Sequence, residues 1–318
     1  MENFVFSVNA TFPIFLVMLA GWVLRRFGML TQGFVDVANR FNFYVTLPIL
    51  LFTEISTMSL SETFDPAFFF YCMGYCMGAT AVGIGIIWAL SVLFIRDKKM
   101  LGAFVQGCYR GSPAVMGVAF VMNMYGNAGA SPLMIVASVP LFNIFAVLIL
   151  TIHGDGGGFH PAQLKKALLG VCKNPILWGI LVGLVFSVAG WRFPTLIDKT
   201  LGYFADMSTP IALIAIGAGV QLGEAFARWK QTLLAAFIKL IALPGVFLTL
   251  ALFLGFQGDQ LVALVAMLGL ATTPSAYIMA KNMKNDAVLT SGIIVVTTLL
   301  SSVTVTGWIF LLRTLGRI

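Results

Sequence analysis

The sequence contains few charged residues. Only 10% of its 318 residues are Asp, Glu, Lys or Arg, and two are histidine. Soluble domains carry roughly 25% charged residues, so a water-soluble fold of this size could not cover its own surface. Acidic residues are the rarer of the two charged kinds, with 12 Asp and Glu against 19 Lys and Arg. The net charge of +7 does not indicate a nucleic-acid partner, because basic residues in a membrane protein report its topology first.

Residues suited to catalysis and metal binding are equally sparse. The four cysteines (Cys72, Cys76, Cys108 and Cys172) fall in or beside apolar segments, without the histidines or acids that would complete a metal site. No His-Glu-x-x-His pattern occurs, and the Gly-rich stretch 153–160 lacks the Gly-Lys-Ser/Thr ending of a phosphate loop. We therefore expect no enzyme activity, no metal and no cofactor other than H⁺ or Na⁺ as a coupling ion.

Apolar residues, in contrast, make up 59% of the chain, and the mean hydropathy is +0.97. They form repeated stretches of about 20 residues, the length that crosses a bilayer as a helix. A backbone in lipid must satisfy its own hydrogen bonds, and these stretches are too long and too evenly apolar for barrel strands. The sequence predicts an all-α polytopic membrane protein. The start, Met1-Glu2-Asn3, lacks the basic region of a signal peptide, so we expect the first apolar segment to be a true span.

Apolar windows between charged or turn-rich breaks predict ten transmembrane helices. They cover residues 5–24, 34–55, 67–95, 103–124, 131–152, 170–190, 200–222, 230–255, 260–280 and 287–312. With the N-terminus outside, thirteen of the 19 Lys and Arg residues fall in inner loops, four in outer segments and two within spans. This bias predicts a multi-pass protein of the cell membrane with both termini outside.

The chain also shows an internal repeat. Three proline pairs recur at offsets of 162, 162 and 161 residues: Pro13 with Pro175, Pro48 with Pro210, and Pro113 with Pro274. Five spans per half would give the halves opposite orientations. We therefore predict a first five-helix repeat at 1–152, a cytoplasmic linker at 153–164 and a second, inverted repeat at 165–318.

Spans 4 and 9 differ from the others because a polar, Gly- or Pro-containing segment interrupts each of them. Such interruptions at corresponding positions of inverted halves indicate a transporter binding site near the midplane, and half-helix N-termini favour anions. The predicted binding residues are Arg110, Gly111, Ser112, Pro113, Thr272, Thr273, Pro274 and Ser275.

Charged residues inside spans are costly, roughly 2.5–3.5 kcal/mol for an arginine at a helix centre, so each needs a partner or a function. Arg110 could grip a carboxylate with both ends of its guanidinium, or pair with an internal acid such as Asp206. Lys239 could contact substrate, or serve a helix break or an acid as a structural partner. Asp206 could carry a coupling proton or cap its helix. Glu54, at the outer end of span 2, is interpreted as interfacial.

An ordered set of short motifs resembles the auxin efflux carrier family, which includes plant PIN-type auxin exporters and bacterial malonate transporters. The motifs are Phe43-Tyr44-Val45-Thr46-Leu47-Pro48, Val115-Met116-Gly117 with Met124-Tyr125-Gly126, Pro210-Ile211-Ala212-Leu213, Lys239-Leu240-Ile241-Ala242-Leu243-Pro244 and Ala280-Lys281. The resemblance implies ten helices with helices 4 and 9 broken and crossing. Helices 1, 2, 6 and 7 would form a scaffold that could also support a homodimer. Helices 3–5 and 8–10 would form a moving transport domain.

The resemblance further implies a secondary active transporter of small organic anions, mono- or dicarboxylates, working by alternating access. Two alternatives stay open at this point: a sodium-coupled carrier similar to the bile-acid symporters, and a membrane sensor or channel on the same fold. The expected partners are the anion and the bilayer, a homodimer through the scaffold helices stays open, and no nucleic acid is expected.

Overall fold

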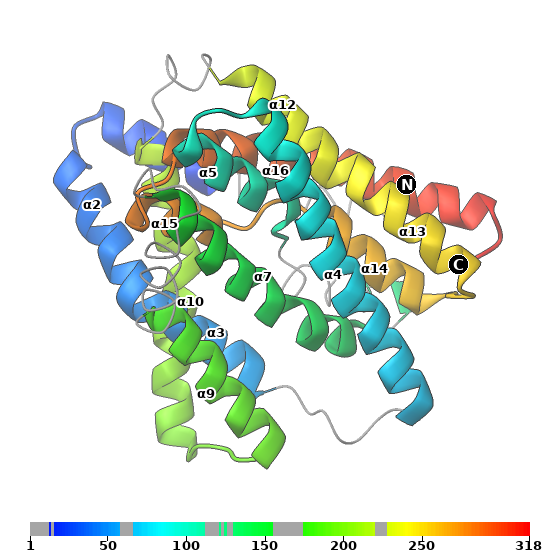
Figure 1. Cartoon of the computed structure of the whole chain (residues 1–318). Helices are drawn as coiled ribbons and strands as arrows, with labels where there is room; N and C mark the ends of the chain where they lie inside the picture. The colour runs from blue at the N-terminus through cyan, green and yellow to red at the C-terminus, as the bar shows by residue number, and fades with distance from the viewer. Residues whose placement is uncertain are drawn as a thin grey trace.

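The computed structural model of the chain describes residues 13, 16–57, 66–111, 121, 124–125, 130–154, 174–219 and 228–318, with backbone only at 66–69, 132–133 and 136. Within these ranges every regular element is a helix (Figure 1). After a helical stretch at 16–26, the elements are α2 (Gln32–Phe41), η1 (Asn42–Thr46), α3 (Leu47–Ser56), α4 (Pro66–Phe94), α5 (Lys98–Tyr109), α7 (Ser131–Gly154), α9 (Pro175–Ala189), α10 (Thr195–Gly219), α12 (Trp229–Phe237), η3 (Ile238–Ala242), α13 (Leu243–Phe253), α14 (Asp259–Gly269), α15 (Ser275–Asn282) and α16 (Ala287–Thr314).

Five of the described helices are long and apolar enough to cross a bilayer. They cover Phe70–Phe94, Ala137–Gly154, Thr195–Gly219, Trp229–Phe253 and Ala287–Thr314. Each coincides with a predicted span to within a few residues. The all-helical membrane class is confirmed, whereas the count of ten spans, the inverted repeat and the orientation of the termini stay predictions.

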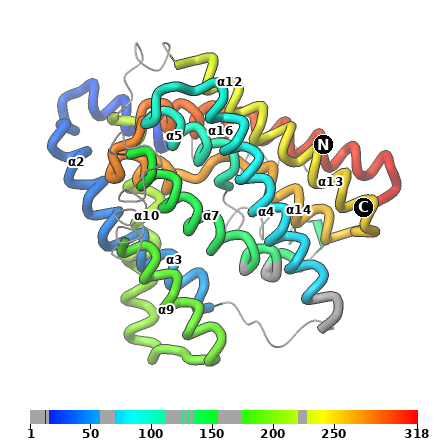
Figure 2. The backbone as a smooth tube through the Cα atoms, in the orientation of Figure 1, coloured from blue at the N-terminus to red at the C-terminus, as the bar shows by residue number. Residues whose placement is uncertain are grey.

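The described helices form two groups (Figures 1 and 2). In one group α3 packs extensively against α9 and α10, and α10 also packs against α2. In the other group α7 packs against α4, α5 and α14, while α16 packs against α12. The two groups meet around α15, which contacts α2 and α10 on one side and α5 and α7 on the other.

Glycines set the close approach of helices in the first group. A side chain added at Gly179 of α9 would run into the backbone carbonyl of Pro48. One added at Gly217 of α10 would run into the carbonyl of Met18. Small residues let membrane helices approach at backbone distance, where dispersion contacts are strongest. These two glycines therefore set the distance of α9 from α3 and of α10 from the helical stretch 16–26.

Two predicted spans contain a π-turn immediately before a proline, at Pro48 and Pro244. Proline has no N–H and its ring clashes with the carbonyl four residues earlier, so the helix widens there. In η3 the N–H of Leu243 donates to the carbonyl of Ile238, five residues back. The carbonyl of Leu240 is left without its usual partner, and the indole N–H of Trp308 donates to it at 2.9 Å. The chain thus continues through both prolines without a break.

The interruption predicted in span 9 is confirmed. Helix α14 ends at Gly269, Leu270 is extended (φ −74°, ψ 158°), and α15 starts at Ser275. In a continuous helix the ring of Pro274 would clash with the carbonyl of Leu270, four residues earlier, and α14 ends just before that residue. In span 4, α5 ends at Tyr109 and Arg110 is extended. Ser112 and Pro113 lie outside the described residues.

One predicted boundary is wrong. The linker was expected to start at His153, but α7 continues through Gly154. The reason is tertiary: His153 is buried, and its imidazole Nε2 accepts a hydrogen bond of 3.0 Å from the indole N–H of Trp88 on α4. The last turn of α7 is therefore held by packing that the Gly-rich sequence does not show. The rest of the predicted linker lies outside the described residues.

Candidate functional site

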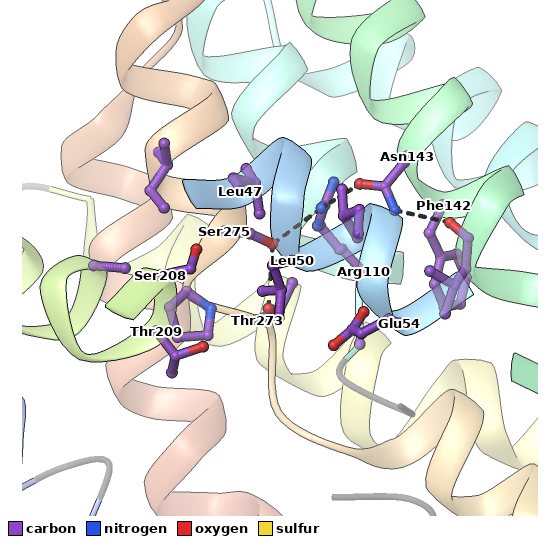
Figure 3. A pocket seen from close by; sticks show the side chains of 16 residues that line it. Leu47, Leu50, Glu54, Arg110, Phe142, Asn143, Ser208, Thr209, Thr273 and Ser275 are labelled. Carbon is purple, nitrogen blue, oxygen red and sulfur yellow. Dashed lines mark hydrogen bonds between the residues drawn. The ribbon is translucent and has the colours of Figure 1, made fainter. Parts of the chain in front are cut away.

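A cavity of about 60 Å³ lies where the two helix groups meet. On the measure for which a water needs about 10–15 Å³, this space holds several waters or a small ligand. One side is formed by α3 and α10, and the other by α7, α15 and the end of α5 (Figure 3). Its polar lining consists of Glu54, Arg110, Asn143, Ser208, Thr209, Thr273 and Ser275, and most of the rest is aliphatic.

Arg110 is the central cation of this cavity. It follows the last residue of α5, and its side chain is only 2% exposed. One terminal nitrogen, Nη2, donates to Oδ1 of Asn143 at 2.6 Å and to Oγ of Ser275 at 3.0 Å (Figure 3). The other, Nη1, contacts the sulfur of Met279 at 3.0 Å. The guanidinium thus joins α7 to the second half of span 9.

All of these partners are neutral. Within the described residues no carboxylate lies within 4 Å of the Arg110 guanidinium, and its Nε has no hydrogen-bond partner. A buried cation held only by neutral acceptors keeps its full charge, and sulfur is a weak acceptor. The arrangement leaves Nη1 and Nε as the donors that a planar anion could engage.

The second break supplies hydroxyl groups and a helix start. Thr273, Pro274 and Ser275 line the cavity, and the Thr273 and Ser275 hydroxyls lie 3.2 Å apart. Ser275 is the first residue of α15, so the partial positive charge of that helix N-terminus lies at the cavity wall. An anion in the cavity would be stabilised by this end and by Arg110 together.

Thr272 was predicted beside these residues but has a different role. It is buried and does not line the cavity. Its hydroxyl donates to the carbonyl of Gly107 in α5 at 2.9 Å, and Oγ1 of Thr297 accepts from its N–H at 3.1 Å. Thr272 therefore ties the second break to the helix that ends at the first. Gly111 lines the cavity as predicted.

The two other charged residues predicted for the site lie elsewhere. Asp206 is exposed on α10 and does not line the cavity, so the predicted pairing of Arg110 with it is not formed. Lys239 is fully buried behind Gly111, and its ammonium donates to backbone carbonyls of Tyr109 and Leu268. Among the described residues, no three His, Cys, Asp or Glu side chains gather at one place.

Four polar lining residues were missing from the predicted set: Glu54, Asn143, Ser208 and Thr209. Glu54 was interpreted as interfacial, yet it is half-buried and shares the cavity with Arg110. Asn143 is a lone amide in the apolar run of α7, a pattern that could have identified it. Ser208 belongs to the repeat match beside Pro210, but only the packing reveals its role, because its hydroxyl donates to Oδ1 of Asn42 at 2.8 Å.

Pro48 of α3 and Pro210 of α10 lie two residues after a contact that joins these two helices. Asn42 Nδ2 donates to the carbonyl of Ser208 at 2.8 Å, and the hydroxyl of Thr46 also donates to Asn42 Oδ1. One buried amide thus joins the residues just before both prolines. The repeat-related motifs are brought together in space, next to the cavity.

Comparison with known proteins places the chain among transporters. Residues 6–309 match the family described as membrane transport protein. An uncharacterized transporter of Methanothermobacter thermautotrophicus is 24% identical over 311 residues, covering 96% of this chain and 98% of that protein. A protein of Rhizobium meliloti named "Putative malonate transporter" is 25% identical over 318 residues, covering 93% and 96%. An uncharacterized transporter of Methanocaldococcus jannaschii is 21% identical over 308 residues, covering 94% and 97%.

These matches run along nearly the whole length of both partners, and a membrane transporter is consistent with the long apolar helices described above. The chain is a membrane transporter and not an enzyme, and it belongs to the membrane transport protein family, the auxin efflux carrier family that its motifs resemble.

Proposed function

We propose that this protein is a secondary carrier of small organic anions that binds one carboxylate group on Arg110. The observation that carries the proposal is the state of that arginine: buried, directly after the end of α5, lining a cavity and bound only by neutral groups. Its guanidinium presents a planar fork that matches a carboxylate bidentately.

The size of the cavity favours a small substrate. About 60 Å³ accommodates a short mono- or dicarboxylate better than a bulky amphipathic acid. Malonate is one candidate, because the Rhizobium meliloti relative carries malonate in its name. At 25% identity the substrate itself is not transferable, so the proposal extends only to the chemical class.

The position of the cavity supports alternating access. Glu54 and Ser208 come from the helix group proposed as the scaffold, whereas Arg110, Asn143 and Ser275 come from the proposed transport domain. A ligand between them would contact both bodies. Movement of one body past the other would then open the same site first to one side of the membrane and then to the other.

A gradient of H⁺ or Na⁺, or the membrane potential, would drive this carrier. Glu54 is the acid best placed to carry a proton, since it shares the cavity with the arginine that would hold the anion. An anion entering beside a charged carboxylate is repelled, so uptake of H⁺ by Glu54 would favour loading. Asp206, exposed on α10, is a second candidate.

A ligand screen followed by one substitution tests the proposal. Purified protein is first heated with a panel of small carboxylates at two pH values, with and without Na⁺, and the carboxylate that raises the unfolding temperature most is kept. Its affinity is then measured for Arg110→Ala and for Arg96→Ala, an exposed arginine outside the cavity. We expect Arg110→Ala to weaken binding about ten- to a hundredfold, the range for losing a charged hydrogen bond, and Arg96→Ala to bind normally.

Unchanged affinity in a folded Arg110→Ala protein would remove this residue from the binding site. A saturable requirement for Na⁺ in the screen would instead favour a sodium-coupled carrier.

A further inference from the structure

Two helices end against each other in the interior of this protein, both with their C-termini. Helix α5 ends at Tyr109 and α14 ends at Gly269. The last carbonyls of a helix have no partner within the helix, and they carry the negative end of its dipole. Two such ends meeting in an apolar interior repel each other and leave acceptors without donors, so something positive is needed between them.

Lys239 occupies this position. Its Nζ donates to the carbonyl of Tyr109 at 3.0 Å and to the carbonyl of Leu268 at 2.8 Å, one from each helix end. The side chain is 0% exposed, and among the described residues no carboxylate lies within 4 Å of it. The ammonium therefore has backbone carbonyls where a buried lysine would ordinarily have an acid.

The surrounding sequence directs the lysine to this point. Lys239 is the second residue of the π-turn η3, which the following Pro244 enforces. Gly111 leaves room for the ammonium: a methyl group added there would lie 3.1 Å from Lys239 Nζ and 3.1 Å from the carbonyl oxygen of Met267. The π-turn η3 and the absence of a side chain at Gly111 both allow the Lys239 ammonium to reach the two carbonyls.

We propose that the Lys239 ammonium is a tethered cation that holds the two helix ends together, in a site which a free small cation would have to fill if the lysine were absent. The two carbonyl oxygens, one from each opposed helix end, lie 3.0 and 2.8 Å from Lys239 Nζ, and a small cation with N–H donors could engage the same pair. If Lys239 only filled space, its charge and its N–H donors would be dispensable. An apolar side chain of equal length could then replace it.

If the protein is the carrier proposed above, the role of Lys239 bears on whether transport needs Na⁺. The junction of α5 and α14 would then keep a donor of its own chain between the two helix ends throughout the transport cycle. Anion uptake by the unaltered protein would then need no Na⁺ at this junction.

Chemical rescue tests the inference without any transport assay. Lys239→Ala removes the donor and leaves space beside the two carbonyls, and ethylammonium chloride supplies the missing N–H donors and charge. Tetramethylammonium chloride at the same concentration is the matched salt, because its charge is equal but it has no N–H and is too large. Lys230→Ala, an exposed lysine on α12, controls for loss of a positive charge. Unfolding temperatures of the purified proteins are followed by tryptophan fluorescence.

We expect Lys239→Ala to unfold several degrees below the unaltered protein, and ethylammonium to restore most of the difference in a saturable manner. Tetramethylammonium should not do so, and the unaltered protein and Lys230→Ala should not distinguish the two salts. An unchanged unfolding temperature for Lys239→Ala would overturn the inference, as would a lowered temperature that responds equally to both salts.

If Lys239→Ala cannot be purified, Lys239→Met decides. It keeps the length of the side chain and removes only the charge and the donors. A lowered unfolding temperature supports the tethered cation, and a temperature equal to or above that of the unaltered protein overturns it.

Discussion

Arg110 and Glu54 bring opposite charges to one small cavity without forming an ion pair within 4 Å. An arginine fully paired with an acid would offer little to a substrate, because the substrate would have to displace a stronger partner. Here Asn143 and Ser275 orient the guanidinium without neutralising it. An incoming anion could therefore bind Arg110, and a proton could neutralise Glu54, without first breaking an ion pair between the two.

Replacing Glu54 with glutamine should strengthen anion binding. The substitution keeps the shape of the side chain and removes a negative charge from the cavity wall, a change worth on the order of 1 kcal/mol, or about fivefold in affinity, at neutral pH. The advantage over the unaltered protein should shrink as acidic pH protonates Glu54. Asp198→Asn, an exposed acid at the start of α10, should have no effect. Weaker binding by Glu54→Gln would show that the carboxylate itself contacts the substrate favourably.

The site was partly predictable at the scale of single residues. A charged or hydroxyl residue beside a proline in an apolar span is conspicuous, which is why Arg110, Thr273 and Ser275 could be named from the sequence. Glu54 could not, because a carboxylate near a span end is usually interfacial and only the packed structure shows that it faces the cavity. Thr272 looked equivalent to Thr273, but one lies toward α5 and the other toward the cavity.

At the scale of elements, the extended segment between α14 and α15 does more than interrupt a span. It turns the carbonyl end of α14 toward Lys239 and the N–H end of α15 toward the cavity. The Lys239 side chain donates to the C-terminal end of α14. An anion held by Arg110 would be stabilised by the N-terminal end of α15. Under the two proposals above, one break would supply a position for the lysine and a position for the anion on opposite sides of the same segment.

Two glycines of α9, Gly179 and Gly183, face the backbone of α3, and Gly179 makes the closer approach. Gly179→Ala would place its methyl group against the Pro48 carbonyl, so α9 must shift outward, at a cost of about 1–3 kcal/mol for an overpacked contact. Gly202→Ala on α10 is the control, because nothing lies within 4 Å of its added methyl group. We expect a lower unfolding temperature for the first and an unchanged or slightly higher one for the second. Equal temperatures would show that α9 is not held at this distance.

Elements were predictable to within a few residues wherever apolar runs were long, as for α4 and α16. Hydropathy could not show the π-turns, because a π-turn has the same composition as the helix around it. It also could not show that α7 continues to Gly154, since that turn depends on the contact of His153 with Trp88.

At the scale of the whole molecule, the two helix groups are joined by polar contacts at the end of α15. Lys281 pairs with Asp36 of α2 at 3.6 Å, and the Asn282 side chain donates to the carbonyl of Asn39 at 3.3 Å. By the predicted topology these contacts lie on the cytoplasmic side of the cavity. The cavity itself is lined by Leu47 and Glu54, farther along the same segment. In the described structure α15 therefore contacts α2 at this end of the cavity.

Locking this contact should stop transport. A double variant, Asp36→Cys with Lys281→Cys, would be joined by a short bifunctional thiol reagent whose linker contains a cleavable disulfide. Because alternating access requires α15 to separate from α2, we expect the cross-linked protein to lose uptake and to regain it after reduction. Each single-cysteine variant, treated in the same way, should keep its uptake. Full uptake by the cross-linked protein would show that the two helix groups do not move apart here.

Counterflow in proteoliposomes tests the central claim, anion exchange through a site built on Arg110. Vesicles are loaded with the unlabelled carboxylate that best stabilises the protein, and uptake of the labelled carboxylate from outside is measured. We expect saturable uptake that internal substrate accelerates, in the unaltered protein and in Arg96→Ala, and none in folded Arg110→Ala. Uptake that does not saturate, or that Arg110→Ala supports as well as the unaltered protein, would contradict it.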